Sequence, residues 1–130
     1  MEYKYSDITE RIIKACLIVH NTLGNGFQEV IYQRALAIEF AEMQIPFQRE
    51  FCMPIHYREK QIGERRVDFL IEEKICVELK ALIQLENVHL AQAKNYLEAF
   101  NLEIGLLINF GANRLEWKRI FNNKFIDASK

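Results

Sequence analysis

The sequence predicts an α/β domain in which a mixed β-sheet is flanked by helices. Apolar residues at helical spacing open the chain, strand-like alternation follows, and one further helical segment interrupts the strands. The 130 residues are 50% hydrophobic and 27% charged, a composition typical of a globular protein. A chain of this length can bury a core without help from disulfides. We therefore expect residues 1–130 to form a single domain.

Two amphipathic helices are predicted in the first third of the chain. Apolar residues recur every three or four positions over residues 6–23, and Gly24-Asn25-Gly26 offers the left-handed turn that ends such a helix. The second helix is predicted from about residue 29 to residue 43. One stripe of it carries large apolar side chains, namely Tyr32, Leu36, Phe40 and Met43. Both helices should therefore pack one face against the rest of the domain.

Strand patterns dominate the chain from residue 47 onward. A helix is predicted at residues 88–100, and residues 58–63 are predicted to be a polar connection. The predicted strands are residues 47–57, 65–71, 75–80, 104–109 and 115–120. The element order is then α-α-β-β-β-α-β-β, which is typical of an α/β domain with a mixed sheet.

The register of the hairpin at residues 65–80 follows from its apolar residues. Side chains alternate between the two faces of a strand, and each strand carries three apolar residues at alternate positions. These two sets meet on one face only if the connection has an odd number of residues, such as 72–74. The predicted pairs are Val67 with Leu79, Phe69 with Val77, and Ile71 with Ile75.

The same register places Asp68 directly across from Glu78, with Lys80 one pleat along on the same face. Opposite residues have Cβ atoms about 4.5–5.5 Å apart, so the two carboxylates can reach a common ion. Adjacent carboxylates repel each other, and a divalent cation such as Mg²⁺ or Mn²⁺ removes that repulsion. Such an ion can polarise a phosphodiester, and the lysine can neutralise the growing charge. The alternative is an ordinary salt bridge between Lys80 and one carboxylate.

Two motifs resemble a known family. Asp68 with Glu78-Leu79-Lys80 resembles the PD-(D/E)xK nuclease signature, although Val67 stands where the family's name has proline. Gly26-Phe27-Gln28-Glu29-Val30-Ile31-Tyr32 resembles the motif of the small bacterial GxxExxY proteins, a group assigned to the same superfamily. The resemblance continues through residues 105–110 and 115–120, so it covers nearly the whole chain.

This resemblance implies a restriction-endonuclease-like core and a metal-dependent nuclease. Asp68, Glu78 and the backbone carbonyl of Leu79 would bind Mg²⁺ or Mn²⁺, and Lys80 would assist hydrolysis. DNA is the expected substrate. A second hypothesis is a nuclease fold that only binds nucleic acid or a protein partner, which small size and a formal net charge of −1 favour.

Three further residues are candidates for the site. Glu29 lies on the core-facing stripe of the second helix, and in the resembling nucleases an acidic residue on a helix before the sheet reaches the metal. Its alternative role is to favour the helix N-terminus through the dipole. Gln92 and Tyr96 resemble the QxxxY element of exonuclease-like relatives, in which the glutamine lies beside the catalytic lysine and the tyrosine contacts nucleic acid. A half-buried helix edge is the alternative for this pair.

Basic residues near the hairpin predict a phosphate-binding rim. Arg66 is the one that strand parity places on the face of Asp68, and Lys94 lies on the helix that follows Lys80. The remaining candidates for this rim are Arg58, Lys60 and Arg65.

Other sequence features limit the location and the class of the protein. No apolar run approaches the roughly 20 residues of a membrane span, and the first residues lack a secretion signal, so we expect a cytoplasmic protein without a membrane partner. The three cysteines form no CxxC pair. A homodimer would supply the two active centres that a double-strand cut requires, but no segment identifies its interface.

Overall fold

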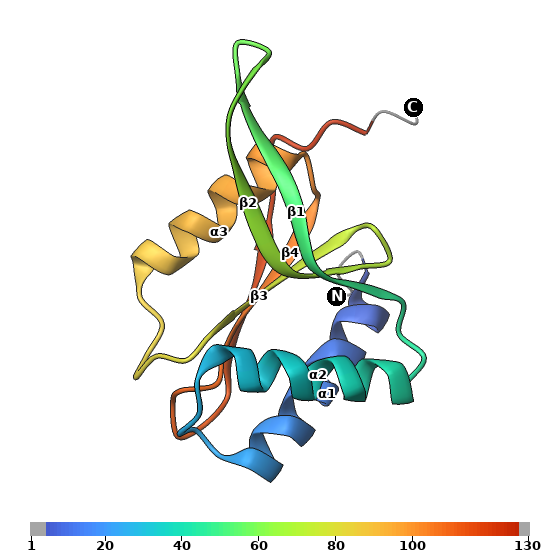
Figure 1. The fold of residues 1–130 in the computed structure, drawn as a ribbon, viewed down its shortest axis with the longest axis vertical. Coiled ribbons are helices and arrows are strands. Elements are labelled where there is room, and N and C mark those ends of the chain that lie inside the picture. The colour runs from blue at the N-terminus through green and yellow to red at the C-terminus, as the bar shows by residue number, and fades with distance from the viewer. Residues whose placement is uncertain (1–4, 128–130) are drawn as a thin grey trace.

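The computed structural model describes residues 5–127, and its elements follow the predicted order (Figure 1). The helices are α1 (Ser6–Leu23), α2 (Glu29–Glu42) and α3 (Asn87–Phe100). The strands are β1 (Phe47–Tyr57), β2 (Lys60–Ile71), β3 (Ile75–Lys80), β4 (Ile104–Asn109) and β5 (Glu116–Phe121). The predicted connection at 58–63 was too long. β2 begins at Lys60, and the turn is only Arg58 and Glu59, both with left-handed φ angles.

The five strands form one mixed sheet in the order β1-β2-β3-β4-β5. All neighbours are antiparallel except β3 and β4, which run parallel because α3 connects them as a crossover. The hairpin of β1 and β2 extends away from α1 and α2 (Figure 1). The predicted mixed α/β architecture is confirmed. None of the helices in residues 5–127 is long and apolar enough to cross a membrane.

Helices cover both faces of the sheet and create two apolar clusters. α1 and α2 pack on one face, over a large cluster that includes Phe69, Ile71 and Val77. α3 packs on the other face, over a smaller cluster that includes Val67 and Cys76. The expectation that Val67 shares a face with Phe69 and Ile71 was therefore wrong.

The reversal of faces has a local cause in β1 and β2. Pairing runs through Phe51 with Val67 and through Arg49 with Phe69, but Glu50 and Asp68 between them are not paired. Glu50 has a φ of 53°, which interrupts the regular pleat of β1 at this point. β2 therefore changes its orientation at Asp68, and the simple alternation of side chains fails there.

Tyr32 holds the connection between α1 and α2 in place. Its hydroxyl donates a hydrogen bond to the carbonyl of Gly24 (2.7 Å) and accepts one from the amide of Phe27 (3.1 Å). Its buried ring stacks on Phe110 at the end of β4, with 4.6 Å between the ring centroids. The tyrosine of the GxxExxY motif thus anchors the start of α2, and with it the position of Glu29.

Candidate active site

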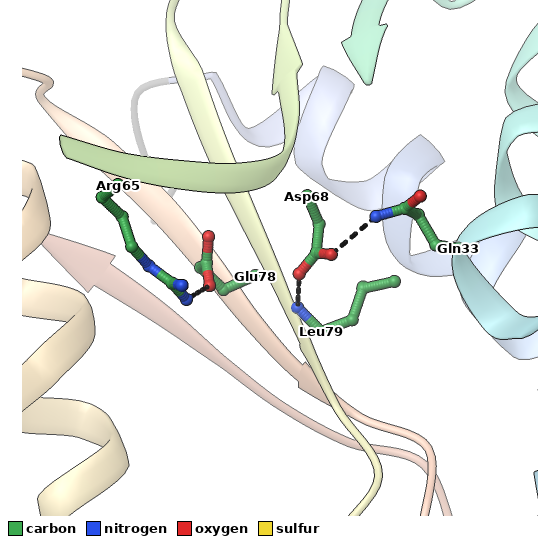
Figure 2. Close-up of polar contacts among 5 residues, drawn as sticks. All are labelled: Gln33, Arg65, Asp68, Glu78 and Leu79. Carbon is green, nitrogen blue, oxygen red and sulfur yellow. Dashed lines mark hydrogen bonds and ion pairs between the residues drawn. The ribbon is translucent and has the colours of Figure 1, made fainter. Parts of the chain in front are cut away.

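Asp68 lies where the ladder between β2 and β3 ends. The predicted pairs Phe69–Val77 and Ile71–Ile75 are confirmed, but the predicted pair Val67–Leu79 and the opposition of Asp68 and Glu78 were wrong, because pairing ends at Phe69. The strands separate, and the Asp68 carboxylate fills the gap. Its Oδ2 accepts a hydrogen bond from the backbone amide of Leu79 at 2.9 Å (Figure 2). The two carboxylates are therefore close without being directly opposite.

Gln33 holds the second oxygen of Asp68, a role that the sequence analysis missed. Its Nε2 donates to Asp68 Oδ1 at 2.8 Å, and the residue is buried (Figure 2). The available signal was its position four residues after Glu29, which puts both side chains on the same side of α2. With both oxygens held, Asp68 has one orientation.

Glu78 is a buried carboxylate with one oxygen unsatisfied. Only 4% of the residue is exposed, and its Oε2 accepts a hydrogen bond from Nη2 of Arg65 at 2.7 Å (Figure 2). Its Oε1 is buried and has no hydrogen-bond partner in the described part of the chain. Burial raises the pKa of Glu78 to about 7, and the charge of Asp68 adds to this effect. An unsatisfied carboxylate oxygen beside a second carboxylate fits the oxygen ligands that Mg²⁺ prefers.

Lys80 and Glu29 belong to the same electrostatic neighbourhood. The positive charge of Lys80 opposes the rise in the pKa of Glu78 and of Glu29. Glu29 is exposed as a residue, but loss of hydration raises the pKa of its carboxyl group, with a further contribution from Asp68. The same carboxyl interacts with the backbone of Ala81. Glu29 on α2 thus lies within electrostatic range of Asp68 and Lys80.

Arg65, and not Arg66, reaches the site. The predicted placement of Arg66 on the face of Asp68 relied on regular alternation, which fails where β2 changes orientation. Arg66 is exposed, with Nη1 4.0 Å from Oε2 of Glu50 on β1. Arg65 pairs with Glu78, so the salt bridge at this centre involves an arginine that the hairpin pattern did not single out.

The candidates on α3 differ in their surroundings. Tyr96 is half-buried, with Arg65 over its ring at 4.8 Å from the centroid and Phe100 stacked beside it. Gln92 is exposed on α3. Lys94 is exposed. Tyr96 is therefore the α3 residue that adjoins the Arg65–Glu78 pair.

Asn109 fixes the chain that leaves the site after Lys80. It pairs with Lys80 across the parallel ladder, and its Nδ2 donates to the carbonyl of Leu82 (2.9 Å) and to Oε1 of Glu116 (2.8 Å). Its Oδ1 accepts from the amides of Leu82 (2.8 Å) and Gly111 (3.1 Å). The signal in the sequence was a polar residue at the end of the apolar strand 104–108. This buried side chain therefore fixes the position of the segment that follows β3.

The donors for a metal ion are limited to a few groups. Within residues 5–127 there is no cluster of three or more His, Cys, Asp or Glu side chains arranged to hold an ion. The neighbouring donors are Asp68 and Glu78, with Glu29 nearby. Leu79, expected to contribute its carbonyl, uses its amide to orient Asp68. Water and substrate phosphates commonly complete the shell of Mg²⁺ when the protein supplies only one or two carboxylates.

The raised pKa of Glu78 predicts a pH-dependent stability. Its folded-state pKa of about 7 exceeds the ordinary value of 4.5, so the stability that the protonated group contributes is present below pH 4.5 and lost as pH rises through 7. We expect the free energy of unfolding, measured in EDTA, to fall as pH rises from 5 to 8. The fall in the parent should exceed the fall in Glu78→Gln by up to about 3 kcal/mol.

Denaturant unfolding at both pH values measures this difference. Glu42→Gln, which alters an exposed carboxylate at the end of α2, serves as the control and should follow the parent. Equal pH dependence in the parent and in Glu78→Gln would show that Glu78 is already ionised at pH 5.

Comparisons with known proteins agree with this architecture. The sequence model described as the PD-(D/E)XK nuclease superfamily matches residues 6–120. A solved structure titled "Crystal structure of SSO0001" is similar, with a TM-score of 0.57 and 17% sequence identity. The alignment covers 97% of this chain and 63% of that one, so this chain spans less than two thirds of the matched protein. At this identity, the likeness concerns the fold alone. A comparison with curated proteins gave no match.

Proposed function

Because the chain belongs to the PD-(D/E)XK nuclease superfamily, we propose that it is a metal-dependent nuclease that hydrolyses phosphodiester bonds, with DNA as its substrate. Within the superfamily we place it among the GxxExxY proteins, on the motif at residues 26–32. The observation that carries the proposal is the buried Glu78 carboxylate, whose Oε1 lacks a partner beside the oriented carboxylate of Asp68. A fold that needed no ion would not require two carboxylates in this position.

The proposed roles follow from the positions of the side chains. Asp68, Glu78, the Leu79 carbonyl and Glu29 would hold Mg²⁺ or Mn²⁺, which supplies Lewis acidity and lowers the pKa of a bound water. Gln33 and the Leu79 amide keep Asp68 in its orientation. Lys80 would donate to the phosphoryl oxygens as negative charge grows on them.

The substrate contacts are proposed for residues around this centre. Gln92 would orient Lys80 or water once substrate is bound, since catalytic hydrogen bonds often form only in the complex. The residues proposed to contact nucleic acid are Tyr96, which adjoins the Arg65–Glu78 pair, and the exposed Arg66 and Lys94, which lie outside that pair.

The second candidate is a module that binds nucleic acid or protein without cleaving. The net charge of −1 and the pairing of Glu78 with Arg65 favour it, because an arginine can satisfy a buried carboxylate without an ion. The free Oε1 of Glu78 opposes it, since a purely structural pair would use both carboxylate oxygens. Metal binding distinguishes the two candidates.

A cleavage panel tests the proposed function. Labelled single-stranded, duplex, flapped and branched DNA, together with RNA, would be incubated with Mg²⁺, Mn²⁺ or EDTA. We expect cleavage that requires the metal and that falls by at least about 100-fold in Asp68→Asn. Asp7→Asn, on the exposed side of α1, is the matched control. Mn²⁺ should also raise the melting temperature of the parent but not that of Asp68→Asn. No cleavage and no Mn²⁺ shift in the folded parent would favour the binding module.

A further inference from the structure

We propose that Arg65 is a displaceable internal cation, which occupies Glu78 in the metal-free protein and moves to a phosphate of the bound DNA when a divalent ion takes its place. This inference rests on the proposed function and specifies how the same site is regulated. It assigns Arg65 two alternating partners, the Glu78 carboxylate and the nucleic acid.

The contact between Arg65 and Glu78 is incomplete. Arginine and carboxylate groups frequently form two parallel hydrogen bonds, but here only Nη2 and Oε2 are joined, at 2.7 Å. Nε of Arg65 and Oε1 of Glu78 are both buried and both lack a hydrogen-bond partner in the described part of the chain. The guanidinium therefore neutralises the charge of Glu78 but leaves one carboxylate oxygen without a hydrogen bond. That oxygen is available to an ion.

The charges explain why a cation is needed at this position. Glu78 and Asp68 are two carboxylates in one neighbourhood, and Glu78 is almost fully buried. Without a cation, their repulsion and the loss of hydration would destabilise the ionised pair. Arg65 supplies a single positive charge to this pair, whereas Mg²⁺ or Mn²⁺ supplies two. An ion bound at Asp68 and Glu78 makes the arginine redundant and repels it.

The side chain of Arg65 can move away from Glu78. It lies on β2 beyond the point where pairing with β3 ends, and its side chain is 33% exposed, against 5% for Glu78. Its guanidinium already lies over the ring of Tyr96, at 4.8 Å from the centroid, so it keeps a favourable contact when it releases Glu78. Arginine stays charged at any physiological pH and binds phosphate well. A released Arg65 at the edge of the centre can therefore pair with the DNA backbone.

This exchange couples the two ligands. Metal binding must displace Arg65, so Arg65 weakens the affinity for metal in the absence of DNA. DNA that captures Arg65 removes this competitor and strengthens metal binding, and by reciprocity metal strengthens DNA binding. The site would then hold its ion firmly only when substrate is present.

Calorimetric titration with Mn²⁺, in the absence of DNA, tests the competition. We expect Arg65→Gln to bind Mn²⁺ about tenfold more tightly than the parent, within the usual range of coupling between two sites. Arg49→Gln, which removes an exposed arginine on β1 of the same hairpin, should match the parent. Arg65→Met keeps the aliphatic stem and replaces Arg65→Gln if the latter does not fold.

Fluorescence anisotropy with labelled duplex DNA and Mn²⁺ tests the transfer, in a Lys80→Ala background that prevents cleavage. Arg65→Gln should bind DNA about tenfold more weakly than its background, despite its tighter metal binding. Unchanged or weaker Mn²⁺ affinity in a folded Arg65 variant would overturn the proposal, leaving a structural salt bridge. Tighter Mn²⁺ binding with unaltered DNA affinity would overturn the transfer to phosphate.

The two proposals fail in different ways. A parent that binds Mn²⁺ and cleaves DNA, with no gain in metal affinity on losing Arg65, keeps the nuclease and rejects the exchange. A folded parent and folded Arg65 variants that all fail to bind Mn²⁺ reject both.

Discussion

Lys80→Ala is expected to lose at least about 100-fold of the metal-dependent cleavage rate while keeping the fold of the parent, since stabilisation of transition-state charge commonly contributes this much. Lys80 is half-buried at the end of β3, and within residues 5–127 it forms no ion pair and donates no side-chain hydrogen bond. Its charge nevertheless acts on both Glu29 and Glu78. A lysine held by the fold at this position, without a structural partner, is available to a phosphate.

Initial rates on the best substrate of the panel measure this loss, with circular dichroism and melting temperature as tests of folding. Lys14→Ala removes an exposed lysine from α1 and should retain the parent rate. A fully active Lys80→Ala would exclude the proposed role of Lys80. If the melting temperature of Lys80→Ala falls along with its rate, the loss of activity reflects a loss of stability and not a role of Lys80 in catalysis.

Gly111→Ala is expected to destabilise the protein by about 3 kcal/mol, at the upper end of the cost of overpacking. A Cβ at Gly111 would lie 2.4 Å from both the backbone nitrogen and the backbone oxygen of Leu82, and 2.6 Å from the carbonyl carbon of Ala81. Backbone atoms cannot rotate away as a side chain can. The segment after Lys80 must therefore move, and the four hydrogen bonds of Asn109 must distort with it.

Denaturant unfolding measures the loss of stability, and the cleavage assay measures the accompanying loss of activity. Gly63→Ala is the matched control, because an added Cβ there meets nothing within 4 Å, and its effect should stay within about 0.5 kcal/mol. A Gly111→Ala variant as stable as the parent would show that the backbone at Gly111 and the backbone at Ala81 and Leu82 can move apart at little cost. Full activity in that variant would further show that catalysis does not depend on the hydrogen bonds that Asn109 forms with the segment after Lys80.

Local sequence patterns were sufficient to predict the order of the elements and the centre of the candidate site. Apolar spacing is a local property, so it located the helices and placed most strands to within a residue of their observed ends. The apolar alternation also determined that Phe69 pairs with Val77 and Ile71 with Ile75. Because those pairs lie next to Asp68 and Glu78, the two carboxylates had to come close in space.

Which side chains complete that centre could not be predicted, because it depends on how distant segments pack together. Strand alternation assumes a regular pleat, but β2 loses its pairing with β1 at Asp68, opposite the left-handed Glu50, and its faces reverse there. This reversal brings in Arg65 and leaves Arg66 outside. The contacts of Gln33 with Asp68, and of Asn109 with Leu82, join residues that are distant in sequence. Such contacts depend on how helices and strands pack in three dimensions, which the period of a single segment does not encode.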